Sequence, residues 1–90
     1  MHPAQRRELT IAEACRLVQE RESRIPREVE FVVLGTGWAI RAYFENITKD
    51  YRVTADGSVQ SVAGGFPTWP PSRALVKRGR CGSSTAERRV

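Results

Sequence analysis

Residues 50–62 (DYRVTADGSVQSV) constrain the fold of this chain more than any other segment. Two short runs rich in Val, Tyr and Ser, residues 51–55 and 58–62, flank the dipeptide Asp56-Gly57. Asp-Gly suits a type I′ turn because both central residues of that turn need positive φ. The segment therefore predicts a β-hairpin closed by a two-residue turn, and with it an antiparallel sheet.

Two further strands are expected earlier in the chain. Residues 29–34 are rich in β-branched and aromatic residues, and the glycines of residues 35–37 mark a turn. Residues 38–44 then alternate between two kinds of side chain. One face of this strand carries Trp38, Ile40, Ala42 and Phe44, and the other face carries Arg41 and Tyr43. This alternation is typical of a strand with one buried face.

An amphipathic helix is expected before the strands, from Ile11 to Ser23. Thr10 and Glu13 have the spacing of a capping box, and Pro26 prevents the helix from continuing. An apolar stripe at helical spacing consists of Ile11, Ala14, Cys15 and Val18. We expect this stripe to face Trp38, Ile40 and Phe44 across one helix–sheet interface.

The chain is 90 residues long, which is one domain. No βαβ pattern appears, so the predicted class is α+β, with one N-terminal helix packed on a three- to four-stranded antiparallel meander sheet. Residues 64–71 (GGFPTWPP) contain three prolines, which exclude a central strand. This segment has two interpretations, a strap that covers the open sheet or a peptide that a partner recognises. The predicted domain covers residues 1–71, and residues 72–90 are expected to be a basic, mostly disordered tail that is dispensable for folding.

The net charge of +5 comes from the end of the chain. Residues 72–90 carry six cations and one anion, namely Arg73, Lys77, Arg78, Arg80, Arg88 and Arg89 against Glu87. Such a tail is either a solvated terminus or an electrostatic contact to nucleic acid. The candidate nucleic-acid contacts are Arg73, Lys77, Arg78 and Arg80.

The sequence does not predict a reactive site. Cys15 lies on the apolar helix stripe, Cys81 lies in the tail, and one distant pair is a poor disulfide framework. His2 is the only histidine, so we expect no metal site, cofactor or catalytic residue, and the chain is not expected to be an enzyme. Asp50 and Asp56 are interpreted as turn residues. No apolar run approaches the roughly 18 residues that a membrane span requires, and a cytoplasmic location is expected.

The order of features from Leu9 to Val62 resembles that of a PepSY-type domain. The helix start reads Leu9-Thr-Ile-Ala-Glu-Ala14, and a late strand reads Tyr51-Arg-Val-Thr-Ala-Asp-Gly57. A family of small bacterial immunity proteins is similar at this level. The resemblance implies a bacterial protein, and PepSY-type domains often act as inhibitory or binding modules outside the cytoplasm.

One helix of about thirteen residues is too short to shield four strands. The sheet face that it leaves open is a candidate surface for a partner, with Tyr43, Tyr51, Phe66 and Trp69 as candidate contacts. We therefore expect a small non-catalytic protein-binding module of the inhibitor, immunity or adaptor type, with an unidentified protein partner. A homodimer through the sheet is also expected. The alternative is a nucleic-acid-associated protein that acts through its basic tail.

Overall fold

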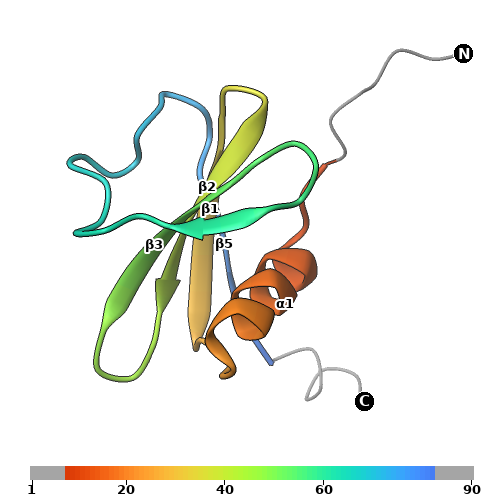
Figure 1. The fold of residues 1–90 in the computed structure, drawn as a ribbon, viewed down its shortest axis with the longest axis vertical. Helices are drawn as coiled ribbons and strands as arrows, with labels where there is room; N and C mark the ends of the chain where they lie inside the picture. The colour runs from red at the N-terminus through yellow and green to blue at the C-terminus, as the bar shows by residue number, and fades with distance from the viewer. Residues whose placement is uncertain (1–7, 83–90) are drawn as a thin grey trace, which may run out of the picture.

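The computed structural model describes residues 8–82, which form one helix and one five-stranded antiparallel sheet (Figure 1). Helix α1 spans Ile11–Glu22, and the strands are β1 (Glu28–Leu34), β2 (Gly37–Tyr43), β3 (Thr48–Val53), β4 (Val59–Ser61) and β5 (Lys77–Arg80). The strand order is β4-β3-β2-β1-β5. The predicted α+β class is confirmed, and the sheet has a fifth strand beyond the predicted meander.

Helix α1 begins as the sequence predicts. The Thr10 side chain accepts a hydrogen bond from the Glu13 backbone N–H at 3.1 Å, and the Glu13 carboxylate accepts one from the Thr10 N–H, which completes the capping box. The helix ends at Ser23, whose φ of 66° is left-handed, and Pro26 lies buried just beyond it.

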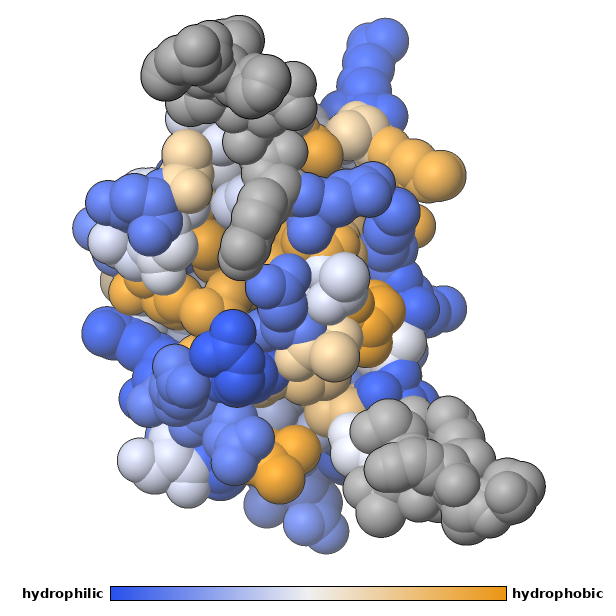
Figure 2. Space-filling view, turned by 90° about the vertical axis from the view of Figure 1, so that its right-hand side faces the viewer, coloured by the Kyte–Doolittle hydropathy of each residue, from blue (hydrophilic) through white to orange (hydrophobic). Residues whose placement is uncertain are grey.

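The main core lies between α1 and the sheet. Ala14 and Val18 on the helix are completely buried against Ile40, Trp38 and their neighbours on the sheet. The predicted interface is confirmed, since Trp38, Ile40 and Phe44 share one apolar cluster with Ile11, Cys15 and Val18. The opposite, solvent-facing side of the helix is largely hydrophilic, with hydrophobic residues exposed between the polar ones (Figure 2).

A second, smaller apolar cluster covers the other face of the sheet. Val32 of β1 and Ala39 of β2 point away from α1, and Phe66, Trp69, Ala74 and Val76 pack over them. We call residues 64–76, which supply this cover, the strap. The rings of Phe66 and Trp69 lie 5.9 Å apart between centroids. The strap interpretation of the Pro-rich segment is therefore confirmed.

Strand β5 corrects the prediction for the end of the chain. Lys77–Arg80 pairs with Glu28–Phe31 of β1, so the domain continues past residue 71, and residues 78–82 are not a disordered tail. The pairing depends on Gly79, because a Cβ at that position would lie 2.8 Å from the Ile11 side chain of α1. The sequence pattern missed this strand because Lys-Arg-Gly-Arg has no apolar alternation. Residues 83–90 of the predicted tail lie outside the described residues.

The two cysteines form a disulfide, which is a second correction. Cys15 on α1 is bonded to Cys81, directly after β5, with an S–S distance of 2.10 Å and a sequence separation of 66. Because β5 returns along β1 beneath α1, it carries Cys81 to the apolar stripe of the helix. Cys15 contacts the core as predicted, and it does so as half of a cystine.

The turn between β3 and β4 is also different from the prediction. The Gly57 N–H donates to the Thr54 carbonyl at 2.9 Å, and the Thr54 N–H donates to the Ser58 carbonyl at 2.9 Å. Three residues therefore form the loop, and only Gly57, with φ of 96°, is left-handed. Asp56 adopts negative φ because its carboxylate accepts from the Ser58 N–H and the Thr54 hydroxyl. This is the type I turn with a following left-handed residue, not the type I′ turn.

Within residues 8–82, no helix has both the length and the apolar character that crossing a membrane requires.

Candidate functional site

The sheet face opposite α1 carries two buried carboxylates, Glu30 on β1 and Asp50 on β3. Their exposed fractions are 7% and 4%, respectively. Side chains alternate between the two faces of a strand, so Val29 and Phe31 enter the main core while Glu30 points to the strap side. Buried carboxylates need hydrogen-bond partners, and the surrounding residues supply them.

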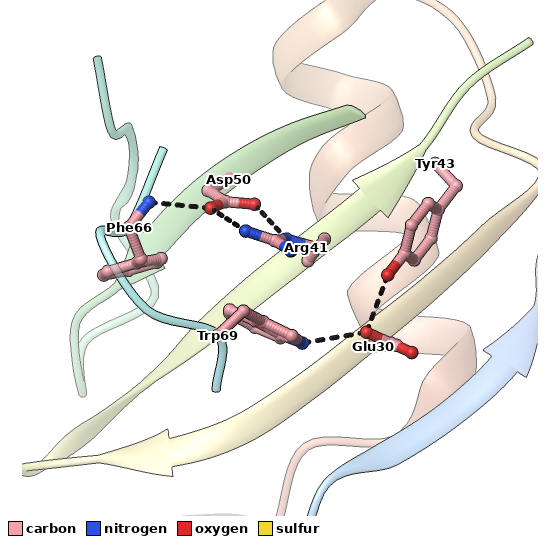
Figure 3. A network of polar contacts seen from close by, with 6 residues as sticks. All are labelled: Glu30, Arg41, Tyr43, Asp50, Phe66 and Trp69. Atoms are coloured by element: carbon pink, nitrogen blue, oxygen red, sulfur yellow. Dashed lines mark hydrogen bonds and ion pairs between the residues drawn. The ribbon is translucent and has the colours of Figure 1, made fainter. Parts of the chain in front are cut away.

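Asp50 forms a bidentate ion pair with Arg41 and accepts a hydrogen bond from the strap (Figure 3). Arg41 lies opposite Asp50 on β2 and donates from Nε to Oδ1 at 2.8 Å and from Nη2 to Oδ2 at 2.9 Å. The Phe66 backbone N–H donates to Oδ2 at 2.8 Å. The hydrogen bond with Asp50 raises the pKa of the Arg41 guanidinium. Asp50 therefore fastens the start of the strap to the sheet, and its predicted role as a turn residue is wrong.

Glu30 fastens the middle of the strap in the same way. Its Oε1 accepts from the Tyr43 hydroxyl and from Trp69 Nε1, each at 2.8 Å (Figure 3). Its Oε2 accepts from Arg78 Nε at 3.1 Å and forms an ion pair with Arg78 Nη2 at 2.8 Å. Burial raises the pKa of the Tyr43 hydroxyl, and the hydrogen bond to Glu30 raises it further. Tyr43 therefore remains protonated as a donor at neutral pH.

Cation–π contacts join the two halves of this network. The Arg41 guanidinium lies 4.8 Å from the centre of the Trp69 ring, and the Arg52 guanidinium lies 5.3 Å from the centre of the Phe66 ring. Each buried carboxylate thus accepts hydrogen bonds from three donors and is balanced by an arginine. Such groups hold a surface in one shape and are poorly suited to proton transfer.

The strap covers only part of this face. Near Tyr43, which is half-exposed, two shallow grooves meet. One groove is lined by Ile47, Thr48 and residues 61–65, and the other by Arg27, Glu28, Arg80 and Gly82. Ile47, at the turn between β2 and β3, is 49% exposed. We call the area formed by Tyr43, Ile47, Thr48, Glu28 and Arg80 the Tyr43 surface.

The structure brings together three of the four predicted partner contacts. Tyr43, Phe66 and Trp69 lie on the strap side, although Phe66, itself part of the strap, is mostly buried against Val32 and Ala39 of the sheet. Tyr51 lies on the opposite face, inside the main core, with no exposed area. Tyr51 is therefore unable to contact a partner. It faces inward because its register partner Ile40 lies on the helix side of β2.

The four predicted nucleic-acid contacts are exposed, but β5 distributes them over both faces. Lys77 and Gly79 lie on the α1 side, whereas Arg78 and Arg80 lie on the strap side. Arg78 is paired with Glu30 and, at 3.1 Å, with Glu28. Arg73 belongs to the strap. The four cations therefore do not make one continuous basic patch.

Sequence reasoning missed the roles of Glu30 and Arg41. The available signal was a carboxylate inside the otherwise apolar run of residues 29–34. This carboxylate can be interpreted only once the strap is known to cover that face of the sheet. Among residues 8–82, no group of three His, Cys, Asp or Glu side chains is placed to hold a metal ion. The titratable groups on the strap side pair with one another, Arg41 with Asp50 and Tyr43 with Glu30.

A separate polar contact joins the end of α1 to β3 on the other face. Glu22 accepts from the Tyr51 hydroxyl at 2.7 Å and from Lys49 Nζ at 3.2 Å. The hydrogen bond from Tyr51, followed by the contacts with Lys49, lowers the pKa of the Glu22 carboxyl below its ordinary value of 4.5. Burial, more than the contact with Glu22, raises the pKa of Tyr51. Glu22 therefore ties the helix to the sheet in its charged form.

Replacing Glu22 with Gln should cost about 1–2 kcal/mol of stability at neutral pH, since hydrogen bonds to a charged group are lost. Because the folded pKa of Glu22 is depressed, its contribution is present above the unfolded value of 4.5 and is lost as the pH falls through the folded value. Urea denaturation of the wild type and Glu22→Gln should therefore converge in acid. Glu20→Gln, which removes an exposed helix-surface pair with Arg16, is the matched control and should cost little. A difference that persists unchanged in acid would contradict this role for Glu22.

Comparison with known proteins gave no match, whether to a family model, to a curated protein or to a solved structure.

Proposed function

We propose that this protein is a small non-catalytic binding module that recognises a protein partner through the Tyr43 surface. The observation that carries this proposal is the half-exposed Tyr43 ring between two shallow grooves, held by its hydrogen bond to Glu30 and bordered by the exposed Ile47. Tyr and Arg are enriched in protein interfaces, where an apolar centre is surrounded by a polar rim. Arg27, Glu28, Lys49 and Arg80 provide such a rim here.

Preorganisation supports the proposal. Binding costs less when the surface does not have to be ordered at the moment of contact. Glu30 and Asp50 hold the strap on the sheet, and the disulfide holds β5 beside α1. The backbone on both sides of Tyr43 is therefore fixed before a partner arrives, which is the property expected of an inhibitor, immunity or adaptor protein.

The disulfide also indicates the kind of cellular compartment in which the protein is located. Disulfides persist in oxidising environments and are rare in the reducing cytoplasm. Our proposal therefore places the protein outside the cytoplasm, in place of the expected cytoplasmic location. The resemblance to PepSY-type domains stays a prediction, and an extracytoplasmic binding role would fit it.

The test compares two exposed aliphatic residues at opposite ends of the sheet. Ile47 borders Tyr43, whereas Leu75 is 81% exposed beside Val33, at the far end of β1. A partner is first captured from host extract with the immobilised wild-type chain, and its affinity is then measured with purified proteins. Ile47→Asp should weaken binding on the order of tenfold or more, because a charge is placed in the centre of the contact. Leu75→Asp should bind as the wild type does.

Two results would overturn the proposal. Loss of binding in Leu75→Asp with full binding in Ile47→Asp would place the interface beside Val33, at the other end of the sheet. Capture that disappears after nuclease treatment, with a steep dependence on salt, would favour the nucleic-acid alternative. Circular dichroism of both variants checks that each is folded.

A further inference from the structure

The outer edge of β4 has backbone groups that point away from the sheet. The Thr54 N–H donates to the Ser58 carbonyl at 2.9 Å, and the Val62 N–H donates to the Asp50 carbonyl at 3.0 Å. Inward and outward groups alternate along an antiparallel strand, so Gln60 also bonds towards β3. The N–H and C=O groups of Val59 and Ser61 therefore face outward. In Figure 1, β4 is the strand nearest the viewer, and none of the described elements is drawn over it.

The two edges of the sheet differ in charge. Residues 58–63 (SVQSVA), which contain β4, carry no charged side chain, and Gln60 and Ser61 are exposed. The other edge strand, β5, carries Lys77, Arg78 and Arg80. Charged side chains, lysine above all, commonly protect edge strands from pairing with another chain. By this criterion β5 is protected and β4 is open to pairing.

The β4 edge is self-complementary. A two-fold axis through Gln60 would place Gln60 opposite Gln60 of a second copy. It would also place Val59 of each copy opposite Ser61 of the other. The outward-facing groups of Val59 and Ser61 would then exchange four backbone hydrogen bonds across the axis. The paired residues carry no charge, and glutamine amides can hydrogen-bond to each other.

The strand order also keeps the net charge away from this edge. The strand β5 lies four strand spacings from β4, which is about 19 Å. This distance exceeds the Debye length of about 8 Å at physiological ionic strength. In a dimer joined at β4 the two β5 strands lie at opposite ends of the joint sheet, farther apart still. Repulsion between these cationic strands is therefore largely screened.

We propose that β4 is a dimerisation edge and that its occupant is a second copy of this chain, joined antiparallel about Gln60 into one continuous sheet. The short edge buries little area, so the association is weak and depends on concentration. This proposal does not depend on the function that we propose for the Tyr43 surface.

Sedimentation equilibrium at rising concentration tests the proposal. The wild-type mass should rise from the monomer value of 10.1 kDa towards twice that value at high micromolar concentration. Gln60→Lys and Gln60→Glu should each weaken association on the order of tenfold or more, because two like charges would face each other across the axis. An equimolar mixture of the two variants should associate again, since the facing charges are then opposite.

The matched controls are Gln19→Lys and Gln19→Glu, which place the same charges on the exposed surface of α1 and should leave association unchanged. Ile47→Asp should also leave it unchanged, which separates this proposal from the proposed function. A wild type that stays monomeric at high micromolar concentration would overturn the proposal. So would a mixture of Gln60→Lys and Gln60→Glu that fails to associate, because the partner of β4 would then be another protein.

Discussion

Replacing both Cys15 and Cys81 with serine should lower the free energy of unfolding by about 2–5 kcal/mol, the usual loss when a small domain loses its disulfide. The bond joins residues separated by 66 positions in sequence, and a cross-link over a long loop strongly restricts the unfolded chain. In the folded state it also holds β5, a strand of only four residues, against α1. Guanidinium denaturation of the oxidised wild type and the double variant measures the difference.

Reduction provides the control for this prediction. Dithiothreitol should bring the wild type close to the double serine variant and leave that variant unaffected. A wild type whose stability is unchanged after complete reduction, as verified by thiol titration, would show that β5 needs no cross-link. The sequence predicted that the C-terminal tail is dispensable for folding. Truncation after Lys77 removes most of β5 together with Cys81, so we expect it to lower the stability.

Replacing Phe44 with alanine should cost roughly 3–5 kcal/mol, the range for emptying a large buried aromatic site. Phe44 is 6% exposed, belongs to the main core, and has the Arg24 guanidinium 4.3 Å from its ring centre. Small domains have free energies of unfolding of about 5–15 kcal/mol. In a marginally stable domain this loss therefore approaches the entire free energy of unfolding. Urea denaturation followed by tryptophan fluorescence measures it.

Phe44→Leu is the matched variant for Phe44→Ala. It keeps most of the apolar volume and should lose less than half as much stability. If alanine and leucine are both tolerated at less than about 1 kcal/mol, Phe44 does not fill the core between α1 and the sheet.

Local patterns predicted the helix and the first four strands because each of these elements has its own periodicity. The alternation of residues 38–44 assigned Trp38, Ile40 and Phe44 to the core face, and the structure confirms it. Thr10 and Glu13 fixed the helix start through a contact between residues close in sequence. These features depend on neighbouring residues, so one short window of the chain is sufficient to detect them.

Apart from the type of the β3–β4 turn, which is local, the features that the sequence missed depend on contacts between distant segments. Strand β5 forms because β1 offers it an edge and because Gly79 leaves room for Ile11. The disulfide forms only after β5 has carried Cys81 back to α1. Glu30 is a tolerable residue in a buried strand because Tyr43, Trp69 and Arg78 reach it from three other places in the chain. A single sequence does not show which distant segments meet.

The central claim is that the Tyr43 surface binds a protein partner, and site-specific photo-crosslinking tests it most directly. A photoreactive amino acid at Thr48, which is exposed in the groove beside Tyr43, should form one dominant adduct with the captured partner. The same group at Gln19, on the exposed surface of α1, should form none. An adduct from Gln19 in the absence of one from Thr48 would contradict the claim and would place the partner on the helix side of the molecule.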